Sequence, residues 1–213
     1  MRKNVFKLAM IVMALFVSTD CFAQAGKVNN FRIKRGTNIS HWLSQSEQRG
    51  EARRLHIQED DFARLEELGF DFVRIPIDEE QFWDEKGNKL PEAWDLLKNA
   101  LDWSRKHNLR AIVDLHIIRS HYFNAVNESD KAANTLFTSE KSQEDLLNLW
   151  RQLSAFLKDR SCDWVAYEFM NEPVAPEHEQ WNKLVAKVHK PFAHWSHSVH
   201  SWLVQTCGRD TRR

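Results

Sequence analysis

Hydrophobic and polar positions follow two patterns that alternate along the chain. Nearly continuous short apolar runs predict β-strands, and segments with apolar residues three or four positions apart predict amphipathic helices. Strands are predicted in "FRIKRGTNIS", "FDFVRIPI", "LRAIVDLHI" and "DWVAYEFMNEP". Helices are predicted in "IQEDDFARLEELG", "PEAWDLLKNALDWSRKHN", "SQEDLLNLWRQLSAFLKD" and "EHEQWNKLVAKVHK".

The first of these helices illustrates the pattern. Ile57, Phe62, Leu65 and Leu68 fall on one face, which we expect to be buried, and Gly69 marks the end of the helix. Two connections are long, "DEEQFWDEKGNKL" after the second strand and "IRSHYFNAVNESDKAANTLFTSEK" after the third. Loops of this length in a compact domain usually serve a functional site or are mobile.

Alternating strands and helices predict an α/β fold with a parallel sheet, because parallel strands need crossover connections. The apolar strands suit either a barrel wall or a doubly wound sheet. Arg74, His116 and Glu172 lie at or near the carboxyl ends of three different strands, where (β/α)8 barrels assemble their active sites. The chain has no glycine-rich phosphate loop, so we expect a (β/α)8 barrel.

Composition narrows the class of protein without naming a partner. The 213 residues carry no net formal charge, which argues against a nucleic-acid-binding or disordered chain. Cys162 and Cys207 follow the N-terminal segment and are too few for a disulfide framework or a zinc site. We therefore expect no metal and no cofactor.

The N-terminus predicts a secretory signal peptide over residues 1–25. Arg2 and Lys3 precede the apolar run "LAMIVMALFV", and the small residues Ala23 and Ala25 mark a cleavage site. The alternatives are a membrane anchor and a lipoprotein site at Cys21. Cleavage would yield a secreted protein, extracellular or periplasmic, with no membrane segment.

Asn171 and Glu172 suggest chemistry at the end of the fourth strand. A carboxyl group aimed into a cleft can act as a general acid and base, and a neighbouring amide can bind a substrate hydroxyl. Pro173 fits a strand that ends there. The simpler alternative is a loop carboxylate or a helix cap.

The motifs "VRIPI", "VDLH" and "NEP" resemble, in this order, those of glycoside hydrolase family 5, the retaining family that includes many endo-β-1,4-glucanases and mannanases. The similarity runs from about Gly36 through Lys190. It implies that Glu172 is the acid/base and that Asn171 holds the sugar 2-hydroxyl. It also implies that Arg74 steadies the nucleophile and that His116 lines the −1 subsite.

Further residues near the loops are candidates for substrate contacts or for packing. We expect His41, Trp42 and Tyr122 to contact substrate, and Trp83 and Phe123 are weaker candidates for stacking on sugar rings. Four other tryptophans have helical core spacing: Trp94, Trp103, Trp150 and Trp181. Glu168 lies four residues from Glu172 on one strand, about 13 Å away, which is beyond the ~5.5 Å that a retaining pair of carboxylates needs. We therefore interpret Glu168 as structural and paired with an inward-pointing cation.

The family pattern breaks towards the C-terminus. A full barrel takes about 250 residues, and the family places its nucleophile, a glutamate, on the seventh strand. We therefore expect residues 26–190 to supply the first four to five βα units, without a nucleophile. Residues 191–213 match no fifth unit of the family, and a one-base shift near Lys190 can spell a sequence that fits better. We interpret this tail as aberrant and out of frame, in preference to a metal site at His194, His197 and His200.

The function implied by the resemblance is hydrolysis of O-glycosyl bonds in a β-linked polysaccharide, by a monomeric enzyme that resembles endo-β-1,4-glucanases. The chain as written is expected to fold poorly and to be inactive without its nucleophile. The alternative is a non-catalytic carbohydrate-binding remnant or the product of a pseudogene.

Overall fold

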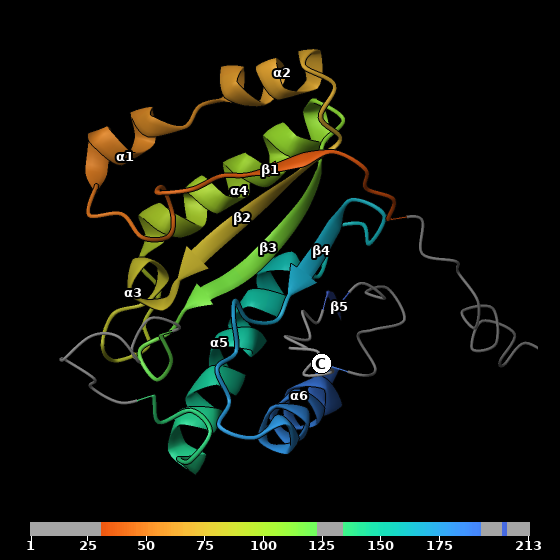
Figure 1. Ribbon diagram of the computed structural model, residues 1–213. Coiled ribbons are helices and arrows are strands. Elements are labelled where there is room, and N and C mark those ends of the chain that lie inside the picture. Colours follow the sequence, from red (N-terminus) through yellow and green to blue (C-terminus); the bar gives the residue numbers. More distant parts are fainter. Residues whose placement is uncertain (1–30, 123–133, 193–201, 204–213) are drawn as a thin grey trace, which may run out of the picture.

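The computed structural model describes residues 31–122, 134–192 and 202–203. Strands and helices alternate through these residues, as the sequence predicts (Figure 1). The strands are β1 (Gly36–Asn38), β2 (Phe72–Asp78), β3 (Arg110–Ile117), β4 (Val165–Glu168) and β5 (Trp202–Leu203). The helices are α1 (Gly50–His56), α2 (Glu59–Glu67), α3 (Glu79–Phe82), α4 (Pro91–Lys106), α5 (Glu140–Leu157) and α6 (His178–Phe192).

All the described strands belong to one parallel sheet with the order β1-β2-β3-β4-β5. Each strand therefore pairs with the next one along the chain, and helices make the crossovers. A doubly wound sheet reverses its strand order at a switch point. The unbroken order is instead that of a (β/α)8 barrel wall, which decides between the two folds that the apolar pattern left open.

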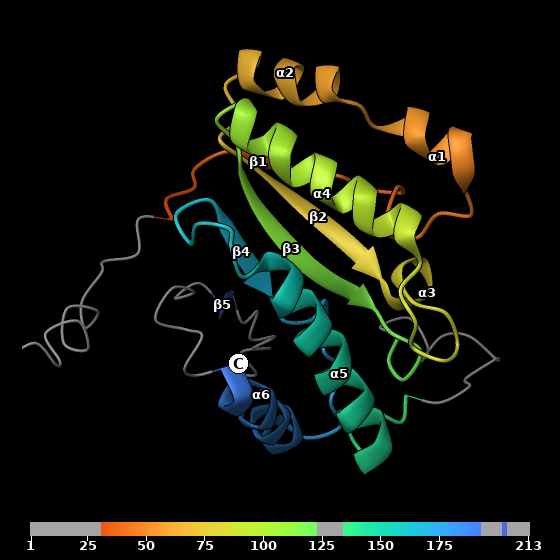
Figure 2. The same cartoon turned by 180° about the vertical axis from the view of Figure 1, so that it is seen from behind.

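The two faces of the sheet carry different side chains, because successive residues of a strand point to opposite sides. Val73, Ile75 and Ile77 of β2 are fully buried in the hydrophobic core. The helices α4 and α5 cover this outer face (Figure 2). Arg74 lies between these apolar residues and projects from the other face, where it meets Asp114 of β3.

Local signals in the sequence set several helix ends. Pro91 occupies the start of α4, where its missing N–H costs no helical hydrogen bond. The side chain of Ser139 caps α5 by accepting from the backbone N–H of Ser142. After α2 the chain turns at Gly69, whose φ of 77° suits a residue without a side chain.

Helix α2 buries only part of the face that the sequence predicts. Phe62 is fully buried, and Ile57 and Leu65 pack against the core while partly buried. Leu68 is 50% exposed, so its predicted burial is wrong. It lies just beyond the last residue of the helix, at the C-cap, where the helical repeat no longer sets the direction of the side chain.

The short elements α1 and α3 were not predicted, and α3 lies in the first of the two long connections. The regular pairing of β4 ends at Glu168, earlier than predicted. The chain nevertheless continues beside β3, because the N–H of Asn171 donates to the carbonyl of Leu115 at 3.2 Å.

Secondary structure continues beyond the predicted boundary at residue 190. Helix α6 runs to Phe192, and β5 pairs with β4 in parallel. The interpretation of the tail as out of frame stays a prediction. The predicted signal peptide, residues 1–25, lies outside the described residues. None of the described helices is both long and apolar enough to cross a membrane.

Candidate active site

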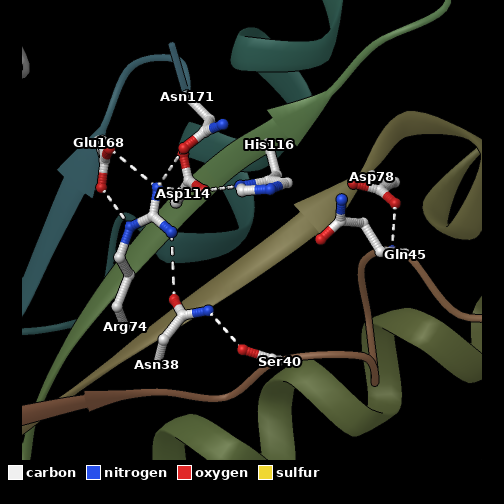
Figure 3. A network of polar contacts seen from close by, with 9 residues as sticks. All are labelled: Asn38, Ser40, Gln45, Arg74, Asp78, Asp114, His116, Glu168 and Asn171. Carbon is white, nitrogen blue, oxygen red and sulfur yellow. Dashed lines mark hydrogen bonds and ion pairs between the residues drawn. The ribbon is translucent and has the colours of Figure 1, made fainter. Parts of the chain in front are cut away.

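Polar side chains from three neighbouring strands meet on the inner face of the sheet, near the carboxyl ends (Figure 3). Arg74 comes from β2, Asp114 and His116 come from β3, and Glu168 is the last residue of β4. Asn171 follows β4 and points into the same cluster. Parallel pairing of β2, β3 and β4 is what brings residues nearly one hundred positions apart into contact.

Arg74 is the centre of this cluster. Its Nε donates to Oε2 of Glu168 at 2.6 Å, and its Nη2 lies 2.7 Å from Oδ2 of Asp114. The same Nη2 donates to Oδ1 of Asn171 at 3.0 Å, and Nη1 donates to Oδ1 of Asn38 at 3.1 Å. One guanidinium thus ties together the last residues of β1 and β4 with the middle of β2 and β3.

The electrostatics of the cluster follow from two buried carboxylates around one cation. Burial lowers the pKa of Arg74, but its hydrogen bond to Glu168 and the charges of Asp114, Glu168 and Glu172 outweigh burial, and the pKa is raised. Asp114 is fully buried, and burial raises its pKa to about 6. Hydrogen bonding to His116 and the charge of Arg74 oppose that rise.

Asn171 is oriented by its contact with Arg74. A guanidinium has only N–H donors, so it must face the amide oxygen of Asn171 and not the amide nitrogen. The Nδ2 group consequently points away from Arg74 (Figure 3). Asn171 is buried, whereas Glu172, the next residue, is exposed.

Glu172 adopts a left-handed backbone conformation with φ of 40°. This conformation is uncommon for a residue with a side chain, and such strained residues concentrate at functional sites. The negative charge of Glu172 is among those that raise the pKa of Arg74, so its carboxylate lies within electrostatic reach of the cluster.

His116 is held by a neighbour on its own strand. Its Nδ1 donates to Oδ2 of Asp114 at 2.7 Å, so one carboxylate oxygen serves both His116 and Arg74. The two residues are two positions apart and therefore lie on the same face of β3. Asp114 thus fixes the orientation of the imidazole.

The loop after β1 carries two predicted substrate contacts with different outcomes. His41 is exposed, has a φ of 53°, and its Nδ1 bonds to the carbonyl of Gln45 at 3.1 Å. Trp42 is fully buried, and its Nε1 donates to the carbonyl of Arg53 at 2.8 Å. The prediction that Trp42 stacks on sugar is therefore wrong, because no face of its ring is accessible.

Asp78, at the end of β2, anchors this loop. Its carboxylate accepts from the backbone N–H of Gln45 at 2.6 Å, and its own N–H donates to the carbonyl of Leu43 at 3.0 Å. Burial raises the pKa of Asp78, and the hydrogen bond from Gln45 opposes that rise. The position of His41 is therefore set from β2.

The comparisons with known proteins agree with this geometry. The model of the family described as "Cellulase (glycosyl hydrolase family 5)" matches residues 29–195. The chain belongs to glycosyl hydrolase family 5. Endoglucanase C of Acetivibrio thermocellus is 29% identical over 157 residues, which are 72% of this chain and 44% of that protein.

Solved structures show the same fold. A glycoside hydrolase matches with a TM-score of 0.66 at 19% identity, over 79% of this chain and 51% of the other. A structure described as an endoglucanase matches with a TM-score of 0.58 at 27% identity, over 76% of this chain and 48% of the other. The chain thus spans about half the length of these relatives, and β1 to β5 form part of a (β/α)8 barrel.

Two further candidates, Trp83 and Tyr122, lie in the connections that follow β2 and β3. Tyr122 is half-buried after β3, where its backbone N–H donates to Oδ1 of Asn134 at 2.9 Å. Trp83 is fully buried and cannot stack on a sugar, and Phe123 lies outside the described residues. The tryptophans predicted in the core are buried or partly buried there: Trp94, Trp103, Trp150 and Trp181.

The prediction that Glu168 pairs with an inward cation is confirmed, and the cation is Arg74. Sequence reasoning missed Asp114 and Asn38 as partners of Arg74. Strand alternation could have found Asp114, because it shares the parity of His116. Asn38 gave no comparable signal, since its contact depends on how β1 pairs with β2.

No cluster of potential metal ligands occurs among the described residues. The alternative metal ligands His194, His197 and His200 fall in the part of the chain that is not described.

Proposed function

We propose that the protein hydrolyses O-glycosyl bonds of a β-linked polysaccharide, with the specificity of an endo-β-1,4-glucanase and retention of anomeric configuration. The observation that carries this proposal is the contact between Arg74 and Asn171 directly before Glu172. It leaves the amide nitrogen of Asn171 to bind a hydroxyl beside a carboxyl group. This contact supports the assignment of Glu172 as a glycosidase acid/base with Asn171 as its 2-hydroxyl contact.

In this proposal Glu172 protonates the glycosidic oxygen and later removes a proton from water. The Nδ2 group of Asn171 donates to the sugar 2-hydroxyl, a contact that strengthens in the oxocarbenium-like transition state. His116, held by Asp114, lines the subsite next to the cleaved bond. His41 and Tyr122 are proposed as further substrate contacts, from the loops after β1 and β3.

A retaining mechanism also needs a nucleophilic carboxylate about 5–5.5 Å from the acid/base. Asp114 and Glu168 are poor candidates, because both are buried and ion-paired with Arg74. Because Arg74 already pairs with both carboxylates, a second candidate function is favoured, in which the described residues bind a β-glycan without cleaving it.

Secretion and assembly complete the proposal. The basic residues Arg2 and Lys3, followed by an apolar run and Ala23 and Ala25, support a signal peptide over residues 1–25. We propose that the mature protein meets its polysaccharide outside the cytoplasm as a monomer.

The test is to incubate the full chain with soluble β-1,4-glucan, mixed-linkage glucan and mannan, and to follow reducing ends and product anomers by NMR. Release of β-configured reducing ends from the β-1,4-glucan would support hydrolysis with retention, and it would overturn the expectation that this chain lacks a nucleophile. Binding to that glucan with no product would support the second candidate function. Neither binding nor cleavage on any glycan would overturn both.

A further inference from the structure

We propose that His121 is a positioning residue for Glu172, which it holds in place through the backbone of Val174. The inference rests on the proposed function, because it takes Glu172 as the acid/base. His121 lies in the connection after β3, more than fifty residues before Val174, and its Nε2 accepts the N–H of Val174 at 3.2 Å.

Two hydrogen bonds fix the turn around Glu172, one on each side. Before it, the N–H of Asn171 donates to the carbonyl of Leu115 in β3. After it, Pro173 has no N–H, so the first backbone donor is that of Val174, and His121 accepts it. Both fixed points belong to β3 or its connection, which makes the turn a bridge from β4 to β3.

The turn needs such fixing because Glu172 is strained. Its φ of 40° lies in the left-handed region, where a side chain is unfavourable. Strained conformations persist only where the surrounding structure determines them more than once. Loss of the contact with Val174 would leave the turn held on one side only, and Glu172 could relax away from the geometry needed for proton transfer.

The contact also defines the protonation state of His121. An N–H donor requires an unprotonated ring nitrogen, so Nε2 carries no hydrogen and the neutral ring carries it on Nδ1. The ring is 1% exposed and stands edge-on to Phe137 at 5.8 Å. Burial lowers the pKa of His121 to about 4, which keeps the ring neutral at pH 7.

His121 retains this contact at a cost. Nδ1 is buried and has no hydrogen-bond partner among residues 31–122, 134–192 and 202–203. A buried donor without an acceptor is unfavourable, and an apolar residue at this position would avoid it. Within the part of the chain that the structure describes, the contact that an apolar residue could not supply is the acceptor for Val174.

The first experiment tests for the hydrogen bond between Val174 and His121 and needs no glycan. In the full chain labelled with ¹⁵N-histidine, NMR at pH 7 should show His121 as the neutral tautomer protonated on Nδ1. The N–H of Val174 should exchange with solvent at least tenfold faster in His121→Leu than in the unmodified chain. Protonation of Nε2, or unchanged exchange in the variant, would overturn the contact.

The second experiment reads its effect on catalysis, using cleavage of β-1,4-glucan. His121→Leu should lower kcat by roughly tenfold to a hundredfold with KM little changed, because small misplacements of a catalytic group have effects of this size. His121→Gln should recover part of kcat, since its Oε1 can accept near the place of Nε2. Phe137→Leu, which loses the ring contact and keeps the acceptor, should leave kcat within about twofold of the unmodified chain.

Equal losses of kcat in His121→Leu, His121→Gln and Phe137→Leu would overturn positioning in favour of packing alone. If the unmodified chain cleaves no glucan, the proposed function fails separately. The ¹³C resonance of the Glu172 carboxyl group then decides the inference: a shift in His121→Leu but not in Phe137→Leu supports it, and no shift overturns it.

Discussion

The outer face of the sheet is stabilised by apolar packing, whereas the inner face near the carboxyl ends is held by ion pairs and hydrogen bonds. The contrast occurs between adjacent residues of one strand. Val73 and Ile75 are fully buried in the core that α4 and α5 complete. Between them, Arg74 contacts Asp114 and Glu168 on the opposite side.

The two faces should respond differently to substitution. Apolar packing depends on volume, and its loss scales with the atoms removed. A buried ion pair fails abruptly, because removing one partner leaves the other charge buried without compensation. The outer face therefore contributes graded stability, and the inner face fixes the geometry of Asn171 and His116.

The largest expected effect is on catalysis. Glu172→Gln should lower kcat by about 10²–10⁴-fold, because the amide cannot donate a proton to the leaving oxygen. Stability should change little, since the side chain is exposed. The measurement is the rate of glucan cleavage beside a urea unfolding curve, with the exposed Glu177→Gln as the matched control. Full activity in Glu172→Gln would refute the assigned role.

The second largest effect is expected on stability, when Arg74, the cation at the centre of the inner face, is removed. Arg74→Met should reduce the free energy of unfolding by about 3–5 kcal/mol, because Asp114 and Glu168 remain buried without their partner. Arg64→Met is the matched control, since it breaks an ion pair with Glu67 in which both side chains are mostly exposed. The control should cost less than about 1 kcal/mol. Similar losses in both variants would contradict the contrast between faces.

A smaller effect concerns the pH dependence of stability. The pKa of Asp114 is raised to about 6 in the folded chain, against about 3.9 in the unfolded chain. The folded state thus holds more protons between these values, and the contribution of Asp114 to stability falls as pH rises from about 4 to about 6.

Asp114→Asn cannot titrate and should lack that fall. Urea unfolding of both proteins at several pH values between 4 and 7 gives the difference. The advantage of the unmodified protein over the variant should be largest near pH 4 and should level off above about pH 6. Two parallel curves would show that the pKa of Asp114 is not raised.

The contrast between the faces also explains what the sequence could predict. Nearly continuous apolar runs and helical patterns located β2, β3, α4 and α5 closely, because apolar burial on the outer face dominates those segments. Their positions in the predicted strands placed Arg74, His116 and Glu172 at or near the carboxyl ends of three strands. In the structure Arg74 is instead the third residue of β2, and its side chain meets the polar cluster from there. Patterns of this kind could not reveal that Asp114 serves both Arg74 and His116, since that contact depends on strand register.

The wrong prediction for Trp42 and the missed contact of His121 have a similar cause, because both depend on contacts that a sequence pattern does not reveal. Trp42 is near the end of a strand on the site side, and sequence position alone cannot tell a ring that meets solvent from one that turns into the core. The contact between His121 and Val174 links two connections, and connections carry no period from which their contacts could be predicted.

The smallest effect is expected from a substitution on the outer face at Ile75, the residue next to Arg74. Ile75→Val removes one methylene from a fully buried side chain and should reduce the free energy of unfolding by about 0.5–1.5 kcal/mol. The substituted side chain points away from Arg74, so kcat for glucan cleavage should stay within about twofold of the unmodified protein. Measuring both unfolding and cleavage in this variant distinguishes the contribution of the outer face to stability from that of the inner face to catalysis. A drop in kcat far larger than the loss of stability would mean that packing on the outer face also sets the position of Arg74.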